Sequence, residues 1–134
     1  MNNKKIKIKS RSKIFKDTWK LMSFWIRKKE ADYRDYVHCY TCDIVLNYKQ
    51  ANAGHYNHNK LDFDPRNIKV QCVRCNKYLR GNLGKYAERL IREHGQEWLD
   101  QLNKDCAEKG NSYKIPELLE IQESLKKEID KIKV

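Results

Sequence analysis

The chain has 134 residues, a length that fits one domain, and its 29 Lys and Arg residues against 18 Asp and Glu give a formal net charge of +11. Such an excess favours a polyanionic partner, of which nucleic acid is the usual one. Charged residues make up 35% and hydrophobic ones 40%, so the core is modest and stabilisation by a bound metal is plausible. Since no apolar run is long enough for a membrane span or a signal peptide, we expect a cytoplasmic protein with no membrane partner.

Residues 1–13 contain six basic residues and no acidic one. No pattern in this stretch would bury a face, and it predicts a flexible basic arm that orders on DNA or stays a solvated tail. Residues 14–30 follow with apolar side chains at helical spacing, which predicts an amphipathic helix. We assign its two tryptophans, Trp19 and Trp25, to the core rather than to base stacking.

Two CxxC pairs dominate the middle of the chain: Cys39 with Cys42, and Cys72 with Cys75. Each pair presents two thiolates on one tight turn, and four thiolates complete the tetrahedral shell of a structural zinc ion. In a reducing compartment, metal ligation is a better explanation of such pairs than disulfides. The fifth cysteine, Cys106, is predicted to be an ordinary thiol.

The segment between the two pairs is predicted to hold short strands. One is expected around residues 43–46, a second leads into His55, and Ile68–Gln71 returns as a third into the second CxxC pair. Residues 57–66 are polar and predict a loop, which Asn67 follows. A helix is predicted to start near Cys75.

The rest of the chain is predicted to be helical. Gly81 and Gly84 interrupt the helix that starts near Cys75, Gly95 ends the one that follows, and Gln96–Lys109 forms another before a break at Gly110–Ser112. The segment 111–134 then carries a final amphipathic helix, with Pro116 in its first turn. Its apolar stripe suits packing on the rest of the chain and pairing with a second copy equally well, and the sequence leaves both open.

The order of the motifs along the chain resembles that of a known class of proteins. The order of the first CxxC pair, Ala53-Gly54-His55-Tyr56, Asn67 and the second CxxC pair with Asn76 resembles the HNH, or His-Me finger, nucleases. With Trp25-Ile26-Arg27, Gln71 directly before the second CxxC pair, Gly81-Asn82 and Glu97-Trp98-Leu99, it is more narrowly similar to the phage NinG family, also called Rap. The resemblance covers roughly residues 19–102. It implies recombination nucleases that cut branched DNA, here in the cytoplasm of a host cell.

The chemistry of such a site can be assigned to three residues. A neutral imidazole suits a general base near pH 7, which predicts that role for His55. The resemblance assigns Asn67 to bracing the loop and orienting that histidine, and Asn76 to binding a catalytic Mg²⁺ or Mn²⁺ ion through its amide oxygen. Many relatives place an Asp before the base histidine as a second ion ligand, and Gly54 stands there in this chain. Candidates for the second ligand are Asp62, Asp64 and His58.

Basic side chains surround the predicted ion ligand, and we expect four of them to contact the phosphates of the cleaved strand: Arg74, Lys77, Arg80 and Lys85. The sequence thus predicts an α+β fold, in which a zinc-stapled ββα-metal (His-Me finger) core spans residues 14–110 and helices flank it. The function predicted is a metal-dependent DNA endonuclease. The alternative is a non-catalytic zinc-ribbon module that binds DNA or a protein. Symmetric resolution of a four-way junction would require a homodimer.

Overall fold

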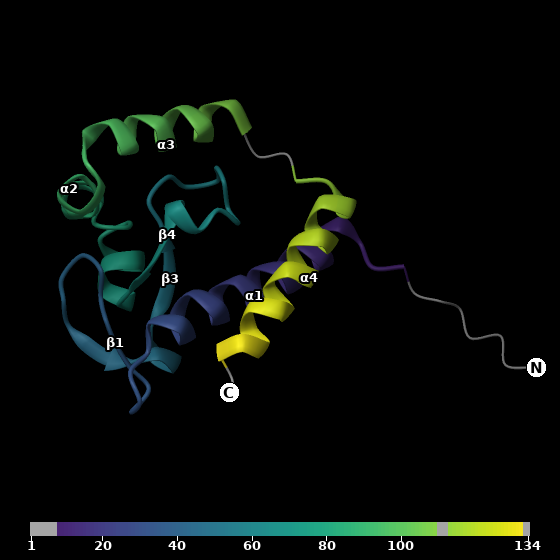
Figure 1. Ribbon diagram of the computed structural model, residues 1–134, viewed down its shortest axis with the longest axis horizontal. Coiled ribbons are helices and arrows are strands. Elements are labelled where there is room, and N and C mark those ends of the chain that lie inside the picture. The colour runs from purple at the N-terminus through teal and green to yellow at the C-terminus, as the bar shows by residue number, and fades with distance from the viewer. Residues whose placement is uncertain (1–7, 110–112, 133–134) are drawn as a thin grey trace, which may run out of the picture.

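The computed structural model describes residues 8–109 and 113–132, in which four α-helices surround two small antiparallel sheets (Figure 1). Its α+β character is the one predicted from the sequence. The predicted break at residues 110–112 and most of the predicted basic arm, residues 1–7, lie outside the described residues. Within the described ranges, no helix is long and apolar enough to cross a membrane.

The first helix, α1, spans Arg11–Glu30 and therefore begins three residues before the predicted start. The cause is Ser10, whose side chain accepts a hydrogen bond from the Lys13 backbone amide at 3.2 Å and so caps the helix. Residues 11–13, which were expected in the basic arm, form the first turn of this helix.

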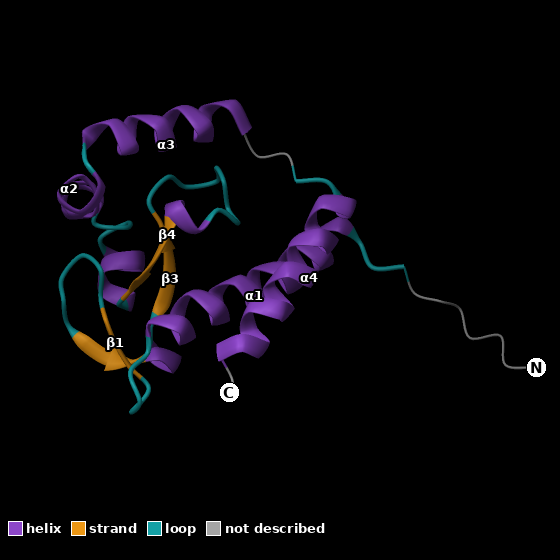
Figure 2. Cartoon of the chain, viewed as in Figure 1, coloured by secondary structure: helices purple, strands orange, loops and turns teal. Residues whose placement is uncertain are grey.

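The two sheets are hairpins of short strands (Figure 2). Strand β1 (Tyr36–His38) pairs with β2 (Val45–Asn47), and β3 (Asn52–His55) pairs with β4 (Ile68–Gln71). The predictions of β4 and of a strand ending at His55 are confirmed, whereas β2 lies one to two residues beyond its predicted place. Strand β1 was not predicted, because three residues are too few to show an alternating pattern.

A five-residue π-helical turn, Arg74–Tyr78, contains Cys75 and stands where a regular α-helix was predicted to start. Arg80, Gly81 and Asn82 then all adopt positive φ, at 50°, 93° and 47°, and reverse the chain into α2 (Leu83–His94). Gly95, with φ 93°, ends α2 as predicted, and α3 (Gln96–Lys109) has the predicted bounds.

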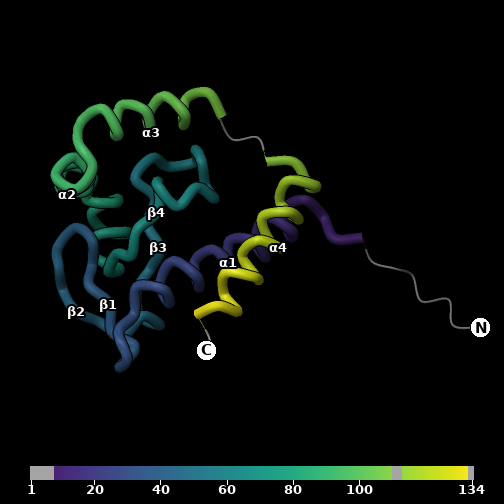
Figure 3. Tube along the Cα trace, in the orientation of Figure 1, coloured from purple at the N-terminus to yellow at the C-terminus, as the bar shows by residue number. Residues whose placement is uncertain are grey.

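The last helix, α4 (Ile115–Ile132), packs against α1 over most of its length (Figure 3). The two helices run in the same general direction, since Arg11 Nε donates to the Tyr113 carbonyl near their start. Farther along, Gln122 Nε2 donates to the buried Thr18 hydroxyl at 2.8 Å. The apolar stripe of α4 therefore covers this chain's own core, the first of the two arrangements that the sequence left open.

Two hydrophobic clusters, apart from the buried cysteines, hold the elements together over the described residues. The larger lies between α1, α4 and the β3–β4 hairpin, where Met22, Ile26, Ile68 and Leu118 are almost fully buried. The smaller joins α2 to α3. Its members are Tyr86, Leu90, Leu99, Leu102 and Cys106. Cys106 thus fills a core, and burial raises the pKa of its thiol, in keeping with an ordinary structural cysteine.

Candidate functional site

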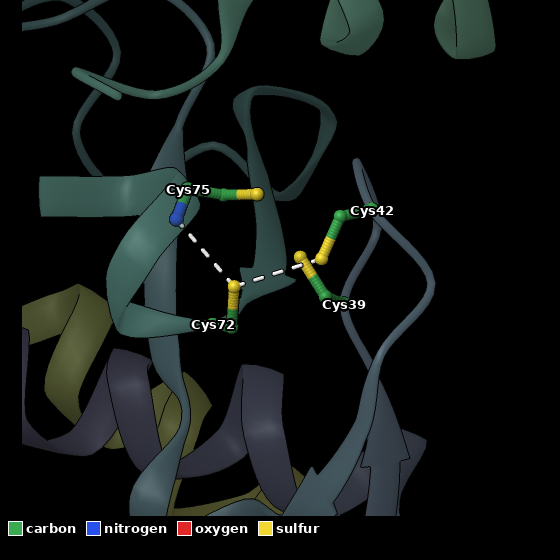
Figure 4. A group of neighbouring side chains, drawn as sticks. All are labelled: Cys39, Cys42, Cys72 and Cys75. Carbon is green, nitrogen blue, oxygen red and sulfur yellow. Dashed lines mark hydrogen bonds between the residues drawn. The ribbon is translucent and has the colours of Figure 1, made fainter. Parts of the chain in front are cut away.

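The four paired cysteines converge from the two hairpins (Figure 4). Cys39 and Cys42 follow β1, while Cys72 and Cys75 follow β4, and all four sulfur atoms lie within 4.8 Å of one another. Cys42 Sγ and Cys72 Sγ are 3.7 Å apart, which matches the roughly 3.8 Å that a tetrahedral ion with Zn–S bonds of about 2.3 Å requires. The donor set therefore fits a structural zinc ion, and these four residues would hold it.

Local hydrogen bonds are directed at sulfur atoms of this cluster. The Cys75 backbone amide donates to Cys72 Sγ at 3.4 Å, and Asn82 Nδ2 donates to Cys75 Sγ at 3.5 Å. Burial opposes ionisation of Cys39, yet hydrogen bonds from Thr41 and from neighbouring amides outweigh it and lower the pKa of the Cys39 thiol to about 6. In Cys42 and Cys72 burial prevails and raises the thiol pKa, so one of these three thiols is set up for ionisation and the other two are not. Asn82 has a left-handed backbone conformation and precedes α2, and its side chain contacts Cys75 Sγ. The turn that starts α2 therefore also supports the cysteines.

His55 is the last residue of β3, and its ring is largely enclosed, with 17% of the side chain exposed. One face of the imidazole stacks on Trp19 of α1, with ring centroids 4.7 Å apart. Nε2 lies 3.0 Å from the Asp62 carbonyl oxygen and 3.8 Å from a carboxylate oxygen of the same residue. Because a carbonyl only accepts, Nε2 must carry the proton in the neutral ring, and Nδ1 is left with a lone pair.

Burial lowers the pKa of His55, an effect that the Asp62 carbonyl and carboxylate oppose and that nearby His58 reinforces. The imidazole is therefore neutral near pH 7. Within the described part of the chain, no group occupies Nδ1. This arrangement suits a general base, because the Asp62 carbonyl fixes the tautomer through Nε2 and leaves the Nδ1 lone pair to accept a proton.

Asn67 is fully buried and holds the loop that supplies the Asp62 carbonyl. Its Oδ1 accepts from the Asn57 backbone amide at 2.8 Å, and its Nδ2 donates to the carbonyls of Asn57 at 3.0 Å and Lys60 at 2.8 Å. Asn67 does not touch His55 directly. It fixes residues 57–61, and the next residue, Asp62, presents the carbonyl that accepts from Nε2 of His55. Any effect of Asn67 on the imidazole therefore passes through the backbone.

Asn76 lies in the π-helical turn, beside Gly54. A β-carbon built on Gly54 would come 2.9 Å from Asn76 Oδ1 and would collide with the Gln71 side chain. Side chains of successive strand residues point to opposite faces. Accordingly, the Gly54 position faces Asn76 and Gln71, whereas the His55 ring faces Trp19. The structure brings Asn76 next to the residue before His55, and the two side chains approach the end of β3 from different sides.

The three residues considered as a second ion ligand lie in different surroundings. Asp64 is bound by the Arg66 guanidinium, at 2.8 Å for the shortest contact, and caps a short turn. Asp62 faces the protonated Nε2 of His55. His58 lies near Gly81, with Nε2 3.3 Å from the place of a β-carbon there. None of the three contacts Asn76 among the interactions of the described residues.

The four basic residues predicted to contact DNA are all exposed. Three of them, Arg74, Lys77 and Arg80, lie in or just after the π-helical turn, and Lys85 lies in the first turn of α2. Over the described residues, none of the four forms an ion pair, whereas Arg66 and Arg89 each bind a carboxylate. Their positive charge is therefore available to an external anion.

Three contributions to the site were not predicted. They are the Asp62 carbonyl that accepts from His55, the Trp19 ring beneath the imidazole, and the amide of Gln71. A backbone acceptor leaves no trace in residue identity, and Trp19 was assigned only to the core. The placement of Gln71 immediately before the second CxxC pair, within a buried strand, was a signal that could have been followed.

Comparison with known proteins gives the family. A family model described as Bacteriophage Lambda NinG protein matches residues 1–134. Proteins named ninG from Escherichia phage 933W and Escherichia phage lambda are 35% and 34% identical over 103 residues, which cover 74% of this chain and 49% and 48% of theirs. The ninG protein of Salmonella phage P22 is 34% identical over 106 residues, 76% of this chain and 50% of its own length.

The chain thus spans about half the length of the curated relatives it matches. No solved structure gave a significant match. The match to the family model over the whole chain and the sequence identity to several relatives agree with the motif order described above. The chain belongs to the NinG family of bacteriophage proteins.

Proposed function

We propose that this protein is a metal-dependent DNA endonuclease that hydrolyses phosphodiester bonds. The observation that carries the proposal is the state of His55. The ring is neutral, its proton is held on Nε2 by a backbone carbonyl, and Nδ1 keeps a lone pair at the end of a strand. A general base needs a lone pair directed at water and a fixed tautomer, and it contributes roughly 10²–10⁴-fold to a rate.

The roles of the other residues follow from their places. The proposal requires a phosphodiester at the end of β3 that both His55 Nδ1 and Asn76 Oδ1 can reach, although the two side chains lie on opposite faces of the strand. His55 accepts the proton of the attacking water, and Asn67 keeps the Asp62 carbonyl in line with Nε2. Asn76 would hold a Mg²⁺ or Mn²⁺ ion, which when bound offsets charge on the phosphate and on the leaving 3′ oxygen.

The surroundings also support a nucleic-acid substrate. Arg74, Lys77 and Arg80 present unpaired positive charge beside Asn76, and backbone phosphates are the anions that such a cluster binds without regard to sequence. Branched recombination intermediates are the substrate class that the NinG resemblance implies, and a homodimer would supply two such sites to one junction.

A second function, a non-catalytic zinc module that binds DNA or a protein, is favoured by one specific observation. The His55 ring stacks on Trp19 and is mostly enclosed, which is how a structural histidine packs. Both functions require the cysteine cluster and the basic surface. They differ in whether the imidazole is needed for anything beyond packing.

The experiment that separates them measures cleavage of plasmid, forked and four-way DNA by zinc-loaded protein, with Mg²⁺ or Mn²⁺ added one at a time. We expect the wild type to cut, and His55→Ala to keep zinc and DNA binding while losing about 10²-fold or more of the rate. His38→Ala is the matched control, since His38 is exposed and lies next to Cys39. Folded wild-type protein that cuts none of these substrates with either ion would favour the zinc module.

A further inference from the structure

Gln71 carries an unsatisfied oxygen in the interior of the protein. The side chain is fully buried, and its Nε2 donates to the Gly81 carbonyl at 2.9 Å and to the Thr41 hydroxyl at 3.1 Å. Since the Gly81 carbonyl can only accept, the amide cannot be turned over, and Oε1 must point the other way. Among the described residues, Gln71 Oε1 is the one buried side-chain polar atom that has no hydrogen-bond partner.

Such an atom calls for a partner. An unsatisfied buried acceptor costs about 1–3 kcal/mol, so native proteins almost always pair it with a protein group, a water molecule or an ion. The surrounding protein offers no donor to Oε1, although Nε2 of the same amide is fully used.

Oε1 points to Gly54 and lies next to the side chain of Asn76. A β-carbon at position 54 would collide with Gln71 Oε1 and would meet Asn76 Oδ1 at 2.9 Å. The missing side chain of Gly54 therefore leaves room for the Gln71 amide. Two amide oxygens from different elements, β4 and the π-helical turn, converge on this one point, and the Asn76 side chain makes no hydrogen bond within the described chain.

We infer that Gln71 Oε1 and Asn76 Oδ1 are paired ligands of a hard divalent cation. Mg²⁺ and Mn²⁺ take oxygen ligands and keep several waters, so two protein oxygens suffice, while the nearby thiolates select zinc. The role of this ion in cleavage depends on the function proposed above, but the site itself does not. Because both ligands are neutral, the ion keeps its full charge, and DNA phosphate should strengthen its binding.

The test measures Mn²⁺ binding rather than activity. Free Mn²⁺ is followed by its electron paramagnetic resonance signal in zinc-loaded protein, with and without a short DNA duplex, and DNA alone is subtracted. Gln71→Met should weaken Mn²⁺ binding by about tenfold or more, since even outer partners of metal ligands change affinity by 10–100-fold. Gln122→Met is the matched control, because it makes the same change at a partly buried glutamine amide that bonds Thr18 and Ile14 in the α1–α4 contact.

Two further variants separate ligation from folding. Gln71→Glu keeps an oxygen at this point but loses the donor to Gly81, so a ligand role predicts unchanged or tighter Mn²⁺ binding, and a purely structural role predicts loss. The double variant Gly54→Asp with Gln71→Ala moves an oxygen ligand to the space that Oε1 fills, and it should recover Mn²⁺ binding that Gln71→Ala alone loses.

The inference is overturned if the wild type binds no Mn²⁺ with or without DNA, or if folded Gln71→Met binds it like the wild type. In the latter case Oε1 is satisfied by a buried water or by the Gly54 Cα–H group. Binding that depends on Gln71 in a protein that cuts no DNA would keep the ion site and reject the nuclease. Cleavage that survives in a Gln71→Met protein that has lost Mn²⁺ binding would keep both the ion site and the nuclease, and it would show that this ion takes no part in cleavage.

Discussion

Asn67 is a buried amide whose hydrogen bonds all go to backbone groups of residues 57–61. We predict that Asn67→Ala lowers the free energy of unfolding by about 2–4 kcal/mol, since three short hydrogen bonds worth about 1 kcal/mol each are lost and their backbone partners stay unsatisfied. Chemical denaturation measures this change. The Asp62 carbonyl should shift with the loop, so cleavage should fall as well.

The matched control for Asn67 is Asn57→Ala. Asn57 takes part through its backbone, and its side chain makes no hydrogen bond within the described residues, so stability should change by less than about 0.5 kcal/mol. Equal stability of Asn67→Ala and the wild type would show that the loop holds itself in place without the amide.

The depressed pKa of His55 gives a second prediction. A base works in its neutral form, which exists above its pKa, and burial lowers the pKa of this imidazole below the ordinary value of about 6.5. The acid limb of the cleavage rate against pH should therefore lie below 6.5. Asp62→Asn removes a carboxylate that raises this pKa, and it should move the limb to still lower pH. A limb above 6.5 would contradict the neutral imidazole.

Among the elements, the cysteine cluster ties both hairpins to the turn that precedes α2. We predict that Cys72→Ser abolishes zinc binding and unfolds this region, because structural zinc supplies roughly 10–16 kcal/mol in zinc-finger peptides. Zinc content by atomic absorption and helicity by circular dichroism measure the two effects. Cys106→Ser also removes one buried thiol, but from α3, and should keep one zinc ion. A Cys72→Ser protein with full helicity would show that the packing of α1 on α4 suffices.

Elements that depend on local sequence could be predicted, whereas those that depend on contacts between distant residues could not. Gly95 ends α2 through its own backbone freedom, and Ile68–Gln71 shows an alternating pattern, so both were predictable from local sequence. The π-helical turn was not, because nothing in its local sequence distinguishes it from the α-helix that was predicted to start near Cys75. The same holds for the site. His55, Asn67 and Asn76 were marked by motif order, but the Asp62 carbonyl and Gln71 act through tertiary contacts that residue types do not reveal.

The chain carries a formal net charge of +11, and part of its positive charge is neutralised within the protein. Many of its cations are neutralised locally, as Arg66 is by Asp64 and Asp105. Arg74, Lys77 and Arg80 lie in or just after the turn that holds Asn76, Lys85 lies in the first turn of α2, and none of the four forms an ion pair among the described residues. A localised DNA-binding face should therefore depend on these side chains and not on net charge alone.

Replacing Arg74, Lys77, Arg80 and Lys85 with Gln should reduce the slope of log affinity against log salt by up to about 3.6, because each released phosphate contact contributes about 0.9 on duplex DNA. Fluorescence anisotropy with a labelled fork or junction measures this slope. The matched control replaces four exposed lysines of the α3–α4 side, Lys104, Lys114, Lys126 and Lys127, so that net charge falls equally. If the control lowers the slope as much as the first variant does, DNA binding follows overall charge. The prediction that these four side chains contact the cleaved strand would then be wrong.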